Sequence, residues 1–179
     1  YGFGPWSATP TTNSGTAGAY VGGSGVDIVK NTGTINGLIS LGTGDDVFTG
    51  GNFTETVLDD YGLDKINLGG GNDTYNLSGG LVGDATDIVD GGTGSDTVDG
   101  SSISVTLLIN LDTVSHDAVG ANKAFVFGDS EDTVKGFENA RGGNGSDFIY
   151  GTNQANTLEG NGGADVVLGF AGNDVIDGG

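Results

Sequence analysis

A single apolar residue recurs along most of this chain at intervals of about nine residues, separated by glycine and polar side chains. We expect each of these apolar residues to lie at the centre of a three-residue strand, with six residues of turn before it. A strand this short has one central inward-facing side chain, so one apolar stripe is sufficient to form the core. The stripe consists of Val29, Phe48, Val57, Ile66, Tyr75, Val89, Val98, Val134, Ile149, Leu158, Val167 and Ile176.

The predicted turns are built from glycine and aspartate. Residues 91–99 read "GGTGSDTVD" and residues 142–150 read "GGNGSDFIY", with glycine at the first, second and fourth positions and aspartate at the sixth. Glycine permits positive φ and lets neighbouring turns approach closely. One unit is degenerate, because Phe53 replaces its fourth-position glycine and Glu55 its aspartate. The sixth-position aspartates are Asp27, Asp46, Asp64, Asp73, Asp87, Asp96, Asp132, Asp147, Asp165 and Asp174.

The repeats divide the chain into parts. Two blocks, residues 22–99 and 127–179, are separated by a non-repeat bridge over residues 100–126, and we expect the second block to continue beyond Gly179. Within the bridge, alternating apolar residues from Ile103 to Leu111 predict a strand. Residues 1–21 lie outside the period and are interpreted as a linker or the edge of a preceding domain.

Composition limits the possible partners. Asp and Glu total 24 against 5 Lys and Arg, for a net charge of -19, so the chain repels itself unless cations bind. The few basic residues are scattered, which disfavours nucleic acid as a partner. The chain has no cysteine, and therefore no disulfide or thiolate metal site. No apolar run is long enough to span a bilayer, so we predict no membrane insertion.

Stacking the turns brings their carboxylates together. If two units make one coil, every second turn stacks at about 4.8 Å, the usual distance between strands. Aspartates this close repel unless a cation lies between them. Carboxylate and carbonyl oxygens form a hard donor set that suits Ca²⁺, which takes about six to eight oxygen ligands. The sequence therefore predicts several Ca²⁺ ions, without which the repeat does not fold.

The stacking rule also predicts pairs. One side of the roll is expected to align Asp27, Asp46, Asp64 and Asp87, provided that residues 31–40 fill one turn on the opposite side. The other side places Asp73 next to Asp96, with Glu55 before them as a doubtful ligand. In the second block Asp147 pairs with Asp165 and Asn156 with Asp174, a weaker site because Asn156 lacks a charge. The predicted metal ligands are the ten sixth-position aspartates, Asn156, and the first-position glycines Gly22, Gly91, Gly142, Gly160 and Gly169, whose turns leave carbonyl groups free to face an ion.

These units resemble the RTX family of bacterial calcium-binding nonapeptide repeats. The resemblance covers about two-thirds of the chain and implies an all-β fold, a right-handed parallel β-roll. It also implies export by a type I secretion system and folding triggered by extracellular calcium. Members of the family include toxins, proteases, lipases, epimerases, adhesins and surface-layer proteins.

The sequence offers no catalytic centre. His116 is the only histidine, so an H-E-x-x-H zinc site is excluded and His116 is interpreted as a plain loop residue. No serine lies in G-x-S-x-G, and no lysine follows a glycine run as in a P-loop. We predict that the chain is not an enzyme. Aspartates outside the sixth position are expected at the solvated surface: Asp59, Asp60, Asp84, Asp112, Asp117 and Asp129.

The first hypothesis for function is a calcium-dependent structural module of a secreted bacterial protein, extracellular or on the cell surface. Within that class we favour a surface layer, filament or adhesin, with self-assembly through exposed strand edges. The alternative is an accessory module of a secreted protease, lipase or epimerase whose catalytic domain lies outside this chain. Glycan binding along the flat face of the roll is a third possibility.

Overall fold

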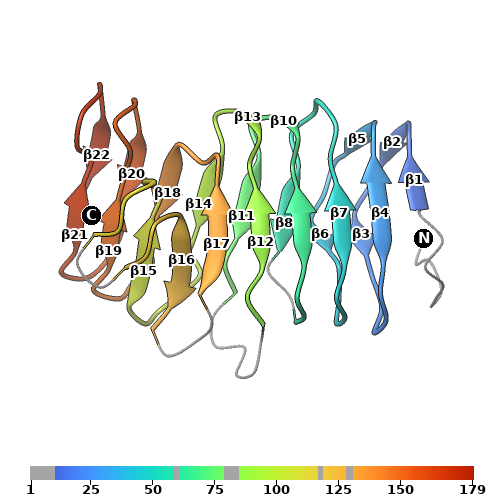
Figure 1. The fold of residues 1–179 in the computed structure, drawn as a ribbon, viewed down its shortest axis with the longest axis horizontal. Helices are drawn as coiled ribbons and strands as arrows, with labels where there is room; N and C mark the ends of the chain where they lie inside the picture. The colour runs from blue at the N-terminus through green and yellow to red at the C-terminus, as the bar shows by residue number, and fades with distance from the viewer. Residues whose placement is uncertain (1–10, 59–60, 79–84, 117–118, 128–130) are drawn as a thin grey trace.

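The computed structural model describes residues 11–58, 61–78, 85–116, 119–127 and 131–179. Within these residues the chain forms strands and turns only, so it contains no helix suited to crossing a membrane. The strands follow one another as stacked coils along one long axis, with the two termini at opposite ends (Figure 1). The predicted all-β parallel roll is confirmed.

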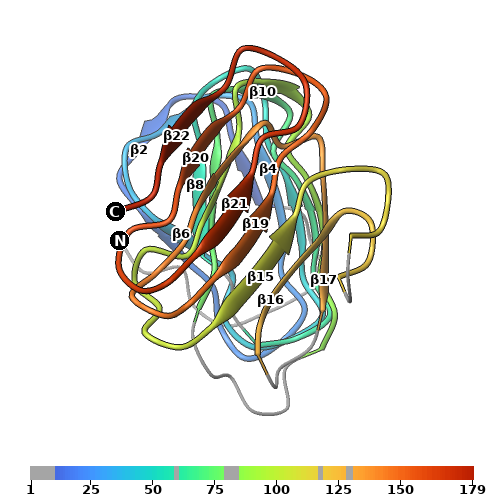
Figure 2. The same ribbon diagram turned by 90° about the vertical axis from the view of Figure 1, so that its left-hand side faces the viewer.

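Two sheets form the walls of the roll, which Figure 2 shows along its axis. The ten-stranded sheet contains, in spatial order, β1 (Thr11–Asn13), β4 (Ile28–Asn31), β7 (Val47–Thr49), β9 (Lys65–Asn67), β12 (Ile88–Asp90), β17 (Asp132–Lys135), β16 (Lys123–Val126), β15 (Leu107–Asn110), β19 (Phe148–Tyr150) and β21 (Val166–Leu168). The eight-stranded sheet contains β3 (Tyr20–Val21), β6 (Ile39–Ser40), β8 (Thr56–Leu58), β11 (Thr74–Asn76), β14 (Thr97–Asp99), β18 (Asn139–Arg141), β20 (Thr157–Glu159) and β22 (Val175–Asp177). Two short pairs lie beside the walls: β2 (Thr16–Ala17) with β5 (Thr34–Ile35), and β10 (Gly70–Gly71) with β13 (Thr93–Gly94).

The core is one side chain thick in each strand, as the apolar stripe predicts. Parallel pairing places equivalent residues in register, for example Phe48 beside Ile66 and Val57 beside Tyr75. Phe48, Val57 and Tyr75 are fully buried between the two walls. Residues on either side of them in each strand remain at least partly exposed, so the turns must contribute much of the stability.

Part of the segment before Gly22 belongs to the roll. From Thr11 onward it forms β1, β2 and β3, which pair in parallel with β4, β5 and β6. Tyr20 of β3 is buried against the core. These residues therefore make the first described coil.

The region between the repeat blocks adds two strands to the ten-stranded sheet, one of which, β16, runs in the opposite direction. Strand β16 is antiparallel to both of its neighbours, β15 and β17, whereas β15 is parallel to β19. The strand predicted from Ile103 to Leu111 is shorter than expected, because β15 covers only Leu107–Asn110. Leu107, Ile109 and Ala124 are fully buried and continue the core row through this region.

We expect Gly62→Ala to lower the free energy of unfolding by about 1–3 kcal/mol, the cost of a strained backbone position. Gly62 has a φ of 143°, and a Cβ there would lie 1.6 Å from the carbonyl oxygen of Gly44 in the preceding coil. Gly25 is the matched control, since it holds the same fourth position in its unit but an added Cβ meets nothing within 4 Å. Urea unfolding in saturating calcium, followed by circular dichroism, measures both, and equal effects would contradict the prediction.

Candidate metal centre

Two columns of acidic side chains run along the roll, one at each edge of the walls. We name as the first column Asp27, Asp46, Asp64, Asp87 and Asp132, which lie at the start of strands of the ten-stranded sheet, and as the second column Glu55, Asp73, Asp96 and Glu138, which lie at the start of strands of the eight-stranded sheet. Past the bridge, Asp147 and Asp165 continue the ten-stranded side, and Asn156 and Asp174 the eight-stranded side. Each side chain of the two named columns comes two residues before the buried centre of its strand.

Backbone hydrogen bonds hold the columns in register. In each named column, the N–H of every acidic residue except the last donates to a carboxylate oxygen of the next coil. The donor to acceptor distance is 2.7 Å from Asp27 to Asp46, and 2.8 Å both from Asp46 to Asp64 and from Asp64 to Asp87. The predicted order of this stack is confirmed, and so are the pairs of Asp73 with Asp96, Asp147 with Asp165, and Asn156 with Asp174.

Two members of the columns were not paired by the sequence analysis. Asp132 lies beside Asp87, whose N–H donates to it at 2.9 Å across 45 residues of sequence. Glu138 accepts the N–H of Asp96 at 2.9 Å, although it belongs to no full repeat. A signal for Glu138 was available, because it precedes buried Ala140 by two residues, as each sixth-position aspartate precedes its core residue.

On the N-terminal side of Glu55, uncharged side chains continue the second column. The amide of Asn31 donates to Glu55 Oε1 at 2.6 Å, and Asn13 donates to Asn31 Oδ1 at 2.7 Å. Asn31 is fully buried. At this end, side-chain amides supply the donors that link successive coils.

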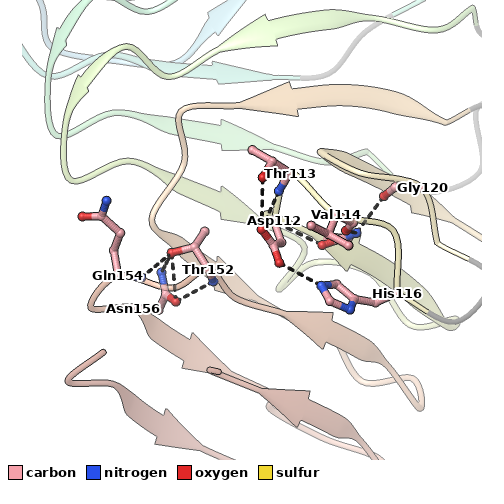
Figure 3. Close-up of polar contacts among 9 residues, drawn as sticks. Asp112, Thr113, Val114, His116, Gly120, Thr152, Gln154 and Asn156 are labelled. Atoms are coloured by element: carbon pink, nitrogen blue, oxygen red, sulfur yellow. Dashed lines mark hydrogen bonds and ion pairs between the residues drawn. The ribbon is translucent and has the colours of Figure 1, made fainter. Parts of the chain in front are cut away.

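Asn156 is also satisfied by protein groups alone. Its Oδ1 accepts the N–H of Thr152 at 2.7 Å, and its Nδ2 donates to the Thr152 hydroxyl at 3.1 Å (Figure 3). The same Nδ2 donates to the Glu138 carbonyl at 2.6 Å. Without a charge and with its amide occupied, Asn156 offers less to a cation than an aspartate does, and its role as a weak ligand stays a prediction.

Several carboxylate oxygens in the columns are buried without a hydrogen-bond partner: Glu55 Oε2, Asp73 Oδ2, Asp96 Oδ2 and Asp165 Oδ2. A buried charge is costly unless a counter-charge or donor meets it. The ion pairs found among the described residues join His116 to Asp112, Lys135 to Asp90, and Arg141 to Asp99 and Glu159, all outside the columns. None of these four pairs includes a column carboxylate.

The pKa values reflect this uncompensated burial. Burial raises the pKa of Glu55 to about 7, opposed by the hydrogen bond from Asn31 and reinforced by the charge of Asp73. Burial likewise raises the pKa of Asp96 to about 6, and it shifts the pKa values of Asp73 and Asp147 upward. The columns therefore favour binding of a positively charged species, either protons or a metal cation.

The turns leave space beside the carboxylates that only glycine allows. A Cβ added at any of the five first-position glycines would come within 3.0 Å of the Oδ2 of the aspartate in its own unit. Those glycines are Gly22, Gly91, Gly142, Gly160 and Gly169. Among the residues described, no three acidic, histidine or cysteine side chains converge on one point, so backbone carbonyl oxygens must complete any coordination shell. Unpaired carboxylates beside exposed carbonyls fit a hard cation such as Ca²⁺.

A separate polar cluster surrounds His116 at the end of β15 (Figure 3). Its Nε2 lies 2.9 Å from Asp112 Oδ2, and its ring stacks on Phe170 and Tyr150 with centroids 4.5 and 5.3 Å away. The hydrogen bond with His116 holds the pKa of Asp112 below its usual range. The prediction of a solvated surface for Asp112 is wrong, since it is 8% exposed and accepts N–H bonds from its own loop. Asp59, Asp60, Asp84, Asp117 and Asp129 lie outside the described residues.

Comparison with known families gives one assignment. A family model described as the RTX calcium-binding nonapeptide repeat matches four copies, over residues 49–80, 82–102, 132–159 and 150–179. Together these copies cover more than half of the chain. No curated protein matches the chain. The matched repeat is a calcium-binding structural unit and carries no catalytic group of its own.

In chelator, we expect stability to fall as the pH rises from about 4.5 to about 7. The folded pKa of Glu55, about 7, exceeds its ordinary value of 4.5, so the folded state holds the proton more tightly and loses that advantage as the proton leaves. Asp96 acts in the same direction, since its pKa is raised to about 6.

With calcium present the trend should reverse, so that stability rises with pH, because protons compete with the ion for the same oxygens. Circular dichroism across this pH range measures the β-structured fraction in chelator, and urea unfolding measures stability in calcium. A chelator stability that rises with pH would contradict the assignment of uncompensated carboxylates.

Proposed function

Because this chain belongs to the RTX calcium-binding nonapeptide repeat family, we propose that it is a calcium-dependent structural module of an extracellular bacterial protein. The proposal rests above all on the buried carboxylate oxygens that have no partner among the described residues, at Glu55, Asp73, Asp96 and Asp165. The chain is too acidic, with a net charge of -19, to neutralise these groups itself. A divalent cation supplies the missing charge and cross-links adjacent coils.

The residues that would hold the ions are the column carboxylates and the carbonyl groups of the glycine turns between them. On the ten-stranded side these include Asp46, Asp64 and Asp87, and on the eight-stranded side Asp73 and Asp96. Carboxylate and carbonyl oxygens favour Ca²⁺, which accepts irregular shells of about six to eight ligands. Mg²⁺ is smaller and requires a near-ideal octahedron, which a ladder of flexible turns supplies less well.

Coupling of folding to calcium makes the folded state of the module depend on the calcium concentration around it. Extracellular calcium sites commonly bind at about 10⁻⁴ to 10⁻³ M, so such a chain remains unfolded where calcium is scarce and folds after secretion. Members of this repeat family are typical of secreted bacterial proteins. The wall-like roll then serves as a building block of a surface layer, filament or adhesin.

The proposal includes self-assembly, because a parallel roll presents backbone donors and acceptors at a strand edge wherever no further coil or cap covers it.

Circular dichroism during a calcium titration tests the folding switch, with magnesium as the control and light scattering recorded at the same time. We expect a transition from coil to β-structure in calcium but not at equal magnesium. Scattering that rises with the transition supports self-assembly, and its absence would favour a module of a larger secreted protein. A chain that is fully β-structured in chelator would overturn the proposal.

We expect Asp73→Asn to weaken calcium binding by about tenfold or more, the scale of effects near a metal ligand. The same change should make the chain more stable in chelator, because it removes one of the repelling charges while Oδ1 can still accept the N–H of Glu55. The opposite signs distinguish loss of a ligand from general damage to the fold.

Asp45→Asn is the matched control, since Asp45 is exposed and lies outside the columns. It removes the same charge, and its Oδ1 accepts only the N–H of Leu63 at 3.2 Å. Isothermal titration calorimetry measures calcium binding by both variants, and circular dichroism measures their β-structured fraction in chelator. Equal shifts in the two would mean that net charge, and not the column, controls calcium binding.

A further inference from the structure

Two tyrosines interrupt an otherwise aliphatic core row in the eight-stranded sheet. Register places Tyr20 of β3 and Tyr75 of β11 in the row whose other members are Ile39, Val57, Val98, Ala140, Leu158 and Ile176. Both tyrosines are buried. Buried tyrosine normally requires a partner for its hydroxyl, so each position should serve more than packing.

The Tyr75 hydroxyl reaches across the core to the first column. It lies 3.2 Å from Asp87 Oδ2 and 3.1 Å from Asp132 Oδ2, and all three side chains are buried. A phenol has one proton, so it donates to one of these carboxylates at a time. Three side-chain oxygens thus meet at one rung, and two of them carry charge.

This rung closes the first column at the bridge. Beyond Asp132 the ten-stranded sheet continues with β16 and β15, and the next column carboxylate, Asp147, receives the N–H of Leu107. The pair of Asp87 and Asp132 also joins β12 to β17, where the two repeat blocks meet. Tyr75 therefore stands at the end of the column where the regular stacking stops.

Tyr20 occupies the corresponding place at the other end. Its hydroxyl is hydrogen-bonded to Asp27, the first member of the column, and it lies close enough to Asp46 to feel its charge.

The inner rungs have no such group. The coils that lead to Asp46 and Asp64 carry Ile39 and Val57 at the position of the tyrosines. A neutral hydroxyl cannot offset two carboxylates, so a cation is still required at the terminal rungs. The hydroxyl instead holds the carboxylates that flank the ion in a fixed orientation.

We propose that Tyr75 and Tyr20 are positioning residues of two terminal calcium sites, between Asp87 and Asp132 and between Asp27 and Asp46. This inference rests on the proposed calcium binding of the column. Hydrogen-bonding partners of metal ligands typically change metal affinity by about 10- to 100-fold. The terminal sites should therefore differ in affinity from the inner ones, although the carboxylate ligands are the same.

Terbium luminescence tests the location of the two tyrosines. Tb³⁺ replaces Ca²⁺ in oxygen sites and emits strongly when a nearby tyrosine is excited. We expect emission to fall in Tyr75→Phe and in Tyr20→Phe, and to fall further in the double variant. Tyr150→Phe is the matched control, since Tyr150 is also buried in a strand but stacks on His116 and Phe170.

Calorimetric calcium titration tests the role of the hydroxyl. We expect Tyr75→Phe to bind the same number of ions as the wild type, with one of them weakened by about tenfold or more. A purely structural effect would instead weaken all sites together. If Tyr75→Phe does not fold in calcium, Tyr20→Phe carries the same test at the other end of the column.

The outcomes separate this inference from the proposed function. If the wild type binds neither Ca²⁺ nor Tb³⁺, the proposed function fails and this inference fails with it. If the wild type binds both, and the two tyrosine variants match Tyr150→Phe in emission and in calcium affinity, only the tyrosine assignment is overturned.

Discussion

Repulsion between buried carboxylates is the constraint on which the roll depends. A parallel stack in register places each residue over its equivalent in the next coil, so a sequence with aspartate at one turn position must build a column of aspartates. The N–H of each acidic residue fixes the carboxylate of the next coil, as at Asp46 and Asp64, and thereby holds like charges close together. The backbone ladder and the electrostatics of the column oppose one another until a cation binds.

The thin core explains why this opposition is not overcome by packing. Most repeat strands contribute a single buried apolar side chain, such as Phe48 or Val89, while more than half of each repeat is turn. Gly62, with its positive φ and its close approach to Gly44, lets the coils stack but contributes no side chain to the interior. A larger core could tolerate uncompensated charges, whereas with a core this thin the proposed calcium binding would be coupled directly to folding.

The period of the sequence is enough to predict the stripe, the two walls and the order of the columns, because each follows from register. The positions of residues and strands that depart from the period do not follow from the repeat. Glu138 enters the second column from a shortened unit, and β16 reverses direction through pairings that no repeat encodes. Asp112 is buried in its own loop, where it contacts His116 four residues later and accepts the N–H of Thr113, and this non-repeat loop has no spacing signal that marks the contact.

The columns also end in a defined way, which bears on how folding spreads along the roll. Asn31 closes the second column with an amide, and Tyr20 and Tyr75 meet the ends of the first with hydroxyls. Neutral donors at these places stabilise the terminal coils without adding charge. Since each inner carboxylate faces neighbours above and below, a cation bound at one rung relieves repulsion at the next, as in a one-dimensional array coupled to its nearest neighbours. Folding can then start at a terminal coil and proceed through the inner rungs as calcium binds.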